Sequence, residues 1–203
     1  MKVVDLYSLS PTFSLVAAER GHKVLSILRE DLDDQVNGER YKIRDKWMHP
    51  DVVWTQIPCQ TFSLASAYVH WNKDGTPRTE ECLFGIKRAK YIISLIEELQ
   101  PRYFFIENPF GKLWVQDFMQ GYHVDSLTYC AYGCSRRKPT KIAHNSNWRP
   151  RAMCHPGAGC HEMSAKKARR LGLGRSGTQS LKTKKERADI PRDLIVEILE
   201  AIE

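Results

Sequence analysis

The pattern of apolar and polar positions near the start of the chain predicts a strand, a helix and a second strand. Residues 3–7 and 23–28 form short apolar runs that are typical of buried strands. Between them, residues 13–20 carry apolar side chains at helical spacing, and Gly21 ends the helix. A strand, a helix and a strand in so short a stretch predict a right-handed βαβ unit with parallel strands.

The same alternation continues along the chain. Further strands are predicted at 51–54, 102–106 and 123–129, a long amphipathic helix at 79–99, and a final helix at 193–203. The sequence therefore predicts an α/β fold in which a mainly parallel sheet carries helices on both faces. In such sheets, ligands bind beyond the carboxyl ends of the strands.

The periodicity fades between residues 143 and 179, where Gly, Pro, Cys, His and basic residues prevail. We expect a loop-rich basic insertion there. The chain has 203 residues, 42% of them hydrophobic, which is enough for one core. No low-complexity linker divides it, so we expect a single domain over residues 1–203.

Positive charge is in excess and is concentrated late in the chain. Lys and Arg number 31 against 24 Asp and Glu, giving a formal charge of +7. Basic runs lie at 136–138, 166–170 and 182–185. This clustering favours DNA or another polyanion as partner, and binding through phosphates should weaken steeply with salt. The residues expected mainly to contact phosphates are Lys166, Lys167, Arg169 and Arg170.

The chain has no stretch close to the roughly 20 apolar residues of a membrane span. Its N-terminus also lacks the long apolar region of a secretory signal. We therefore expect a cytoplasmic protein without a membrane partner. Its six cysteines should then be reduced, catalytic or metal-bound rather than paired in disulfides.

Two polar motifs follow apolar runs that are predicted to be strands. Cys59 lies in Pro58-Cys59-Gln60, shortly after the run 51–54, and Glu107 directly follows the run 103–106. Two strands of one sheet would set this thiol and this carboxyl side by side. A thiolate adds covalently to an electron-poor ring while a carboxylic acid protonates a ring nitrogen, so the pair indicates chemistry on a pyrimidine base.

A structural role is the alternative for each residue of the pair. Cysteine is often a small buried hydrophobe, but Cys59 is followed by the polar residues Gln60 and Thr61. Glutamate commonly ends a strand at the surface, but four apolar residues precede Glu107. We therefore favour the chemical interpretation of both.

Four segments resemble motifs of the DNA cytosine-5 methyltransferases, in the same order along the chain. Residues 57–63, Ile-Pro-Cys-Gln-Thr-Phe-Ser, resemble the nucleophile loop, and residues 105–109, Phe-Ile-Glu-Asn-Pro, resemble the Glu-Asn motif. Residues 132–138, Tyr-Gly-Cys-Ser-Arg-Arg-Lys, resemble the basic motif, and residues 188–191, Ala-Asp-Ile-Pro, the closing motif. The compact pattern is most similar to short methyltransferase-like proteins of bacteriophages, which would place the protein in the host cytoplasm.

This resemblance implies a Rossmann-like methyltransferase fold and transfer of a one-carbon group to C5 of a flipped cytosine in DNA. It implies that Cys59 adds to C6 of the base and that Glu107 supplies a proton at N3. Arg136 or Lys138 would position the base and its phosphate, although a solvated basic turn is an equal alternative and the spacing departs from the family's Gln-x-Arg-x-Arg pattern. Asn108 is expected to hold its loop by hydrogen bonds to backbone groups. The other residues expected at the DNA interface are Gln60, Ser63, Asn108 and Arg137.

The resemblance also implies a pocket for S-adenosylmethionine beyond the first strand, but the pattern breaks there. The loop 8–12, Ser-Leu-Ser-Pro-Thr, has no glycine where the family has a glycine-rich turn. Leu28 stands where the family carries the acid that holds the ribose, and Glu30 is the candidate substitute. The expected cofactor-binding residues are Asp5, Tyr7, Ser8, Ser10, Thr12, Phe13, Glu30, Asp45 and Pro58.

Three interpretations follow from this degenerate loop. The enzyme uses S-adenosylmethionine in an unusual pocket, or it takes its one-carbon unit from methylene-tetrahydrofolate and makes 5-hydroxymethylcytosine after attack by water. The third is a non-catalytic DNA-binding relative. Retention of both Cys59 and Glu107 disfavours the third, because a binding module has no use for the pair.

Two further groups of residues each have a functional and a structural interpretation. The segment 154–161 holds Cys154, His155, Cys160 and His161 and, with Cys130 and Cys134 upstream, has the residue types of a structural zinc site. The five-residue gap between Cys154 and Cys160 is looser than usual, so we favour a polar loop that touches DNA and expect no metal. The second group, Tyr68, His70 and Trp71, follows the nucleophile loop and forms either a lid that stacks on bases or a packed aromatic cluster.

Overall fold

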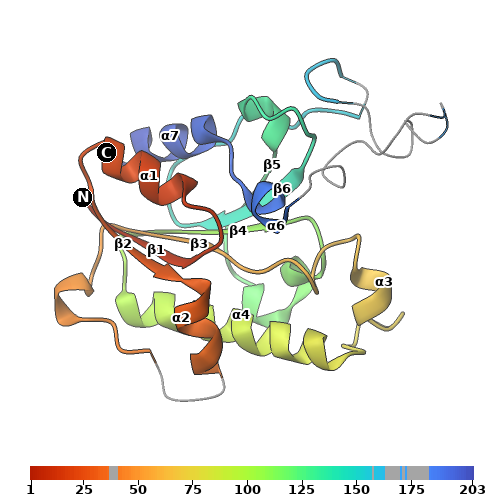
Figure 1. Cartoon of the computed structure of the whole chain (residues 1–203), viewed down its shortest axis with the longest axis horizontal. Helices are drawn as coiled ribbons and strands as arrows, with labels where there is room; N and C mark the ends of the chain where they lie inside the picture. Colours follow the sequence, from red (N-terminus) through yellow and green to blue (C-terminus); the bar gives the residue numbers. More distant parts are fainter. Residues whose placement is uncertain (37–40, 157, 163–169, 171, 173–182) are drawn as a thin grey trace.

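The structure is a computed structural model that describes residues 1–36, 41–156, 158–162, 170, 172 and 183–203 (Figure 1). Six strands form one sheet in the order β2-β1-β3-β4-β6-β5. Strands β1 to β4 are parallel to one another, whereas β6 runs antiparallel to both β4 and β5. The strands are β1 (Lys2–Ser8), β2 (Lys23–Leu28), β3 (Val52–Gln56), β4 (Tyr103–Pro109), β5 (Val124–Thr128) and β6 (Pro139–His144).

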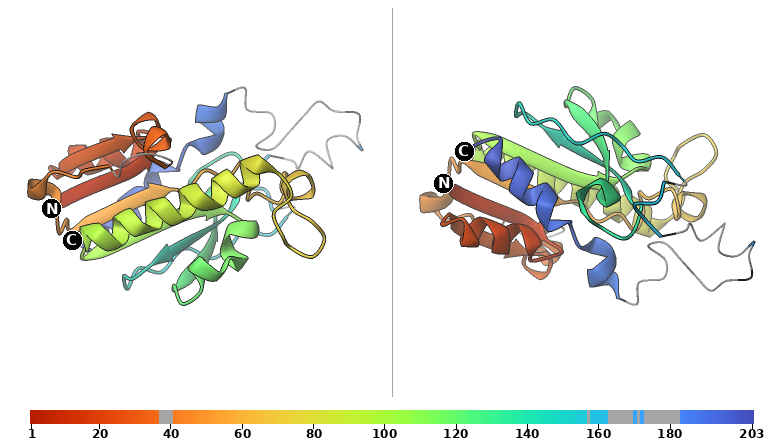
Figure 2. Two further views of the ribbon diagram at one scale, coloured as in Figure 1. Left: turned by 90° about the horizontal axis from the view of Figure 1, so that it is seen from below. Right: turned by 90° about the horizontal axis from the view of Figure 1, so that it is seen from above.

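Helices cover both faces of this sheet. Figure 2 shows the long α4 across one face and α1 with α7 across the other. The described α-helices are α1 (Thr12–Glu19), α2 (Arg29–Asp33), α3 (Ala67–His70), α4 (Glu80–Leu99), α6 (Lys184–Ala188) and α7 (Arg192–Glu200). Short 3₁₀ turns are η1 (Asp34–Val36), η2 (Asp45–Trp47), η3 (Lys112–Val115), η4 (Asp117–Met119) and η5 (Tyr129–Tyr132). This arrangement confirms the expected Rossmann-like α/β fold. Among the described residues, no helix is long and apolar enough to cross a membrane.

The sequence explains the length of α4. Thr79 caps its start, because the side-chain oxygen accepts a hydrogen bond from the backbone N–H of Cys82 at 3.2 Å. The negative charges of Glu80 and Glu81 in the first turn interact favourably with the positive end of the helix dipole. Gln100 ends the helix in the left-handed conformation, at φ 48°. The helix thus spans the sheet and carries one apolar face against it.

Each face of the sheet has its own core. On the α4 side, residues such as Val53, Ile92 and Ile106 are fully buried. On the α1 side, Phe13 stacks on Trp54 with ring centroids 5.0 Å apart. The strands in the middle of the sheet are therefore apolar on both faces, as parallel strands between two helical layers must be.

Strand β6 was not expected from the sequence. Residues 139–142 were assigned to no element, and Ala143 and His144 were placed in the loop-rich insertion, yet all of them belong to the strand. The insertion therefore begins after β6. Pro139 opens the strand and Lys141 lies inside it, which hides its periodicity. Its conformation depends on pairing with β4 on one side and β5 on the other.

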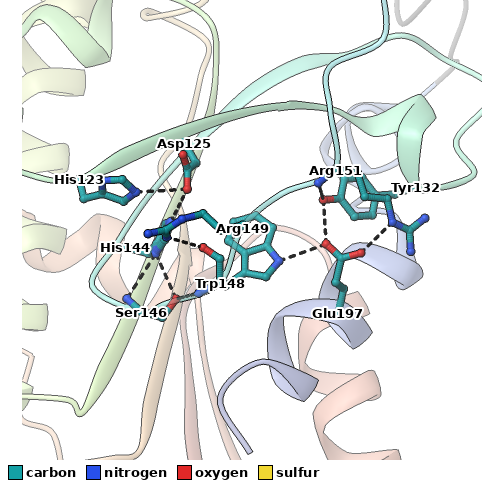
Figure 3. Close-up of polar contacts among 9 residues, drawn as sticks. All are labelled: His123, Asp125, Tyr132, His144, Ser146, Trp148, Arg149, Arg151 and Glu197. Carbon is teal, nitrogen blue, oxygen red and sulfur yellow. Dashed lines mark hydrogen bonds and ion pairs between the residues drawn. The ribbon is translucent and has the colours of Figure 1, made fainter.

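Polar contacts join the end of β6 to β5 (Figure 3). His144 at the end of β6 and His123 before β5 both contact Oδ2 of Asp125, at 3.1 and 3.2 Å. His144 is buried, and this burial lowers its pKa below the usual value. The ring therefore stays neutral and acts as a hydrogen-bonding brace between the last two strands.

A second group of contacts in Figure 3 is centred on Glu197 of α7. Its carboxylate accepts hydrogen bonds from Tyr132 Oη at 3.0 Å and Trp148 Nε1 at 3.2 Å. Arg151 Nε donates to the same carboxylate at 2.7 Å. The segment that leaves β6 is thus held against α7 and η5 before it reaches Cys154.

Candidate active site

The pairing of β3 with β4 brings the two candidate motifs to one edge of the sheet. Gln56, the last residue of β3, lies opposite Glu107 in the parallel register. Cys59 follows three residues later. Asn108 is fully buried, and its Nδ2 donates to the carbonyl of Ile57 at 2.5 Å. The residue next to Glu107 therefore holds the loop that carries Cys59, as expected for Asn108.

A second set of contacts joins the same two loops. Lys112 N donates to the carbonyl of Phe62 at 2.7 Å, and Ser63 forms an isolated bridge with Gly111. A Cβ atom on Gly111 would lie 1.9 Å from the carbonyl oxygen of Phe62, which is closer than atoms can approach. Cys59 itself accepts the backbone N–H groups of Phe62 and Ser63 through its carbonyl, at 3.1 and 2.9 Å. The nucleophile loop is thus fixed by backbone contacts.

Glu107 is buried among hydrogen-bond donors. Tyr129 Oη donates to its Oε1 at 2.9 Å, and Gln56 Nε2 donates to Oε2 at 3.3 Å. Lys138 Nζ lies 3.8 Å from Oε1 and 4.5 Å from the centroid of the Tyr129 ring. Burial, reinforced by Glu107, raises the pKa of Tyr129 well above its usual value, so the phenol keeps its proton and stays a donor.

Some neighbours of Cys59 raise the pKa of its thiol and others lower it. Burial is the largest effect and raises the pKa of the thiol, and the negative charge of Glu107 adds to it. The positive charges of Lys138 and Arg187 lower that pKa, Lys138 being the stronger of the two. Lys138 therefore faces both candidate catalytic groups and is the main side chain that favours the thiolate.

The segment that resembles the closing motif completes this site. Gln56 Nε2 donates to the carbonyl of Ala188 at 2.8 Å, and Lys138 Nζ donates to that of Arg187 at 3.3 Å. The end of α6 thus lies beside the catalytic pair. Gln56, Tyr129 and Arg187 were not singled out in the sequence. The signal for Gln56 was its place at the end of β3, opposite Glu107.

Arg136 lies in a different environment from Lys138. Its guanidinium forms an ion pair with Glu162. It also lines a cavity of about 700 Å³ between α1, the turn after η5 and residues 186–193. Of the two basic residues expected to position the base, the structure brings Lys138 to Glu107 and pairs Arg136 with the insertion.

Three of the expected cofactor-binding residues belong to the protein interior. Tyr7 and Phe13 have no exposed surface, and the ring of Phe13 is occupied by its stacking on Trp54. Phe13 is therefore a core residue rather than a cofactor contact. Asp5 is buried as well, and it accepts hydrogen bonds from Ser8 Oγ at 3.0 Å and Ser14 Oγ at 2.6 Å. Burial raises the pKa of Asp5 to about 6.

The loop after β1 is closed by internal hydrogen bonds. Ser10 Oγ and Thr12 Oγ1 both donate to Oδ1 of Asp189, at 2.7 and 2.5 Å. Tyr7 has φ 60°, a conformation that favours glycine, at the irregularity between Leu6 and Ser8 in the pairing of β1 with β2. A strained tyrosine thus makes the turn for which the family uses glycine, and the loop hydroxyls are already bonded.

The end of β2 carries Leu28 where the resemblance implies an acid, and the candidate substitute Glu30 follows on α2. Leu28 is 49% exposed, and Glu30 is exposed on α2. The nearby Asp33 accepts from Tyr7 Oη and forms ion pairs with Arg29 Nε at 2.8 Å and Arg88 Nε at 2.7 Å. Its charge is therefore neutralised within the protein.

Two of the expected cofactor-binding residues lie outside this loop. Pro58 is buried directly before Cys59. Asp45 begins η2 at the opposite edge of the sheet, where Lys2 Nζ donates to the carbonyl of Met48 at 3.0 Å. The structure does not bring Asp45 to the other candidates. The loop bonded to Asp189 differs from the glycine-rich turn that the resemblance implies for an S-adenosylmethionine pocket.

The residues expected at DNA differ in their exposure. Gln60 is exposed beside Cys59, whereas Ser63 Oγ is bonded to Ser66 Oγ at 2.9 Å. Asn108 has no exposed surface, so it acts on the nucleophile loop and not on DNA. Arg137 Nε donates to the carbonyl of Cys154 at 2.9 Å. Of the four basic residues expected at phosphates, Arg170 is exposed, and Lys166, Lys167 and Arg169 lie outside the described residues.

The aromatic segment after the nucleophile loop divides into a packed part and an exposed part. Trp71 is buried, and its Nε1 donates to the carbonyl of Thr61 at 2.6 Å. His70 Nδ1 is bonded to Thr79 Oγ1 at 2.8 Å. Tyr68 is 77% exposed. Of the three residues, Tyr68 is therefore the one placed to stack on a base.

Comparison with solved structures finds methyltransferases at low similarity. A prophage-encoded protein proposed to be a DNA modification methyltransferase (E. coli) is 16% identical, with a TM-score of 0.44 over 76% of this chain and 52% of that one. The Dnmt2 methyltransferase of S. pombe is 11% identical, with a TM-score of 0.39 over 75% and 51% of the two chains. A DNMT2 mutant of Spodoptera frugiperda is 12% identical, with a TM-score of 0.37 over 81% and 57%.

The chain spans little more than half the length of these three structures. No family model matches the chain, and no curated protein matches it. Similarities this low do not establish a family. The functional argument therefore rests on the site at the ends of β3 and β4.

Proposed function

We propose that this protein transfers a one-carbon group to C5 of a flipped cytosine in DNA through a covalent adduct with Cys59. The observation that carries this proposal is the fixed juxtaposition of the Cys59 loop and Glu107. Paired strand ends, the Asn108 hydrogen bond to Ile57 and the backbone bridge at Gly111 all support that juxtaposition. A structural cysteine would need none of these supports.

The chemistry follows from the two groups. The Sγ thiolate of Cys59 forms a bond to C6 of the base, and the electrons of the C5–C6 double bond move toward the ring carbonyl and N3. The carboxyl of Glu107 delivers its proton to N3, so that no charge accumulates on the ring. C5 is then an enamine-like nucleophile. After C5 has gained its substituent it loses its proton to water, expulsion of the thiolate restores the C5–C6 double bond, and N3 returns its proton to the carboxylate of Glu107.

Lys138 supports the first of these steps. Its ammonium lowers the pKa of the Cys59 thiol and lies 3.8 Å from Glu107. The carbonyls of Arg187 and Ala188 hold Lys138 and Gln56 in place. Tyr68, exposed beside the nucleophile loop, would stack on a base next to the flipped one.

The donor of the one-carbon unit is S-adenosylmethionine or methylene-tetrahydrofolate. The second is favoured by the loop after β1, whose hydroxyls are bonded to Asp189 and whose turn has no glycine. With the folate donor, tetrahydrofolate would leave from the methylene carbon attached to C5 and water would add to that carbon, so the product would be 5-hydroxymethylcytosine. No group of this chain has to change its role between the two cases.

The deciding experiment incubates the protein with cytosine-containing DNA and one donor at a time, then digests the DNA and weighs the nucleosides. A mass gain of a methyl group or of a hydroxymethyl group identifies the donor and supports the proposal. The Cys59→Ser variant is the matched control and should yield unmodified cytosine. Unmodified cytosine from the wild type with both donors would overturn the proposal.

The alternative is a non-catalytic DNA-binding relative. It predicts DNA binding that is equal in the wild type and in Cys59→Ser, with no adduct to 5-fluorocytosine DNA in the presence of either donor. The proposed enzyme instead forms an adduct that resists denaturant, because fluorine at C5 blocks the release step. In both cases binding should weaken steeply with salt, so a salt titration does not distinguish them.

A further inference from the structure

Three cysteines and one histidine outside the proposed active site converge on one point. The ligand atoms of Cys130, Cys154, Cys160 and His161 all lie within 4.8 Å of one another. Cys154 Sγ lies 3.1 Å from Cys160 Sγ and 3.4 Å from His161 Nδ1, and Cys160 Sγ lies 3.4 Å from the same nitrogen. All three cysteines are free thiols.

These separations suit a tetrahedral metal ion. Zinc bonds thiolate sulfur at about 2.3 Å and imidazole nitrogen at about 2.0 Å, so neighbouring ligand atoms around it lie roughly 3.5–3.8 Å apart. Three thiolates and one imidazole form one of the usual structural zinc sites. The four ligand atoms come from two separate parts of the chain, η5 and the insertion. A polar loop without a metal ion would not need to bring three thiols and an imidazole together at these distances.

The membership of this cluster differs from the set considered in the sequence. Cys134 is not part of it, because its sulfur accepts the backbone N–H of Arg136 at 3.4 Å. His161 takes the fourth position. The gap between Cys154 and Cys160 does not need the short spacing of a zinc knuckle. Cys160 and His161 are adjacent and supply two of the ligand atoms, and Cys130 supplies another from η5.

The cluster lies between the insertion and a wall of the proposed active site. Cys130 directly follows Tyr129, the donor to Glu107. Cys154 N donates to Thr128 Oγ1 at 2.9 Å, and the carbonyl of Cys154 accepts from Arg137. A metal ion at this point would tie the insertion to η5 and to the basic motif.

We propose that Cys130, Cys154, Cys160 and His161 bind one zinc ion that staples the start of the insertion to η5. On binding, the three thiols give up their protons and His161 coordinates as the neutral imidazole through Nδ1. The ion keeps no open position, so its role is structural. This site stands apart from the one-carbon chemistry, and its test does not depend on activity.

The experiment measures metal on the full-length protein purified without chelator, by elemental analysis. We expect about one zinc per chain in the wild type and a loss of most of it in Cys160→Ser and His161→Ala. The matched control is Cys134→Ser, which removes a cysteine from the same part of the chain but outside the cluster, and it should keep its zinc. Zinc lost equally from Cys134→Ser and the cluster variants would overturn this ligand set.

A second measurement keeps the proposal testable if a variant does not fold. Cobalt added to the metal-stripped wild type should give the intense visible absorption of a tetrahedral cobalt thiolate site, and zinc should displace it. Absence of both zinc and the cobalt spectrum would overturn the site. A count of four free thiols instead of six in the unreduced, denatured wild type would show a disulfide, and this too would overturn the site.

Discussion

Tyr129 donates its phenolic hydrogen to Oε1 of Glu107 at 2.9 Å, and both side chains are buried. The contact reaches past β6, because Glu107 lies in β4 while Tyr129 directly follows β5, and β6 separates these two strands. The tyrosine holds one carboxylate oxygen, so the orientation of Glu107 toward a bound base depends on it. Tyr129 is thus a positioning residue for the proposed proton donor.

Replacing Tyr129 by phenylalanine should therefore impair the reaction more than the fold. The ring remains in the core, but a buried oxygen of Glu107 loses its donor, at a cost of about 1–3 kcal/mol. Urea unfolding should show this loss of stability. The rate of adduct formation with 5-fluorocytosine DNA should fall, and its pH profile should shift, because the proton on Glu107 is held differently. An unchanged pH profile would mean that Tyr129 is only structural.

Substitutions of Lys138 and Glu107 should change the reactivity of Cys59 in opposite directions. Lys138→Met removes the main charge that lowers the pKa of the thiol, so alkylation by iodoacetamide at neutral pH should slow. Glu107→Gln removes a charge that raises this pKa, so alkylation should accelerate. Both variants should nevertheless lose the one-carbon transfer.

The measurement follows alkylation of the Cys59 peptide by mass spectrometry across a range of pH. Lys141→Met is the matched control, because Lys141 lies three residues further along, inside β6, with its Nζ over the ring of Phe110, 5.3 Å from the centroid. It should leave the alkylation rate unchanged. If Lys138→Met and Glu107→Gln changed the rate in the same direction, the electrostatic account of Cys59 would be wrong.

The parts of the site that the sequence predicts are those set by short segments. Cys59 and Glu107 each follow an apolar strand, and the ends of parallel strands meet at one edge. Gln56 and Tyr129 depend on which strands are neighbours and in what register, which no local pattern encodes. The contact of Asp189 with Ser10 spans 179 positions along the chain, and it decides whether the loop after β1 is open.

In the fold, too, the sequence predicts the elements set by short segments and misses those that depend on neighbouring strands. Strands β1, β3 and β4 carry continuous apolar runs because both of their faces are buried, and these runs were predicted, as was β2 at the edge of the sheet. Strand β6 begins with Pro139 and contains Lys141, so its pattern is polar and it was missed. The candidate metal cluster depends on the path of the chain in the same way. Of the cysteines and histidines singled out in the sequence, the structure brings Cys130, Cys154, Cys160 and His161 together.

Gly111→Ala should disrupt the contact between the two catalytic loops. The backbone at Gly111 is extended, so the substitution introduces no strain in φ, and its effect comes from the overlap with the carbonyl of Phe62. We expect a loss of about 1–3 kcal/mol of stability, as for other overpacked sites. Adduct formation by Cys59 should fall with it. Ser63→Ala, on the other side of the same bridge, is the control for thermal unfolding and should have little effect.

Asp5 should make the protein less stable as the pH rises through the mildly acidic range. Its pKa is about 6 in the folded protein and 3.8 in the unfolded chain, so the folded state binds more protons between these values. Stability from this group is therefore present below pH 3.8 and is lost as pH rises to about 6. Between about pH 4 and pH 8 the loss should amount to about 2 kcal/mol.

Asp5→Asn removes this titration, while its amide oxygen can still accept from Ser8 or Ser14. The difference in unfolding free energy between the variant and the wild type should therefore grow by about 2 kcal/mol in favour of the variant from about pH 4 to pH 8. Urea unfolding of both proteins at several pH values measures this difference, and other titrating groups cancel in the comparison. Parallel curves would show that Asp5 does not titrate in this range.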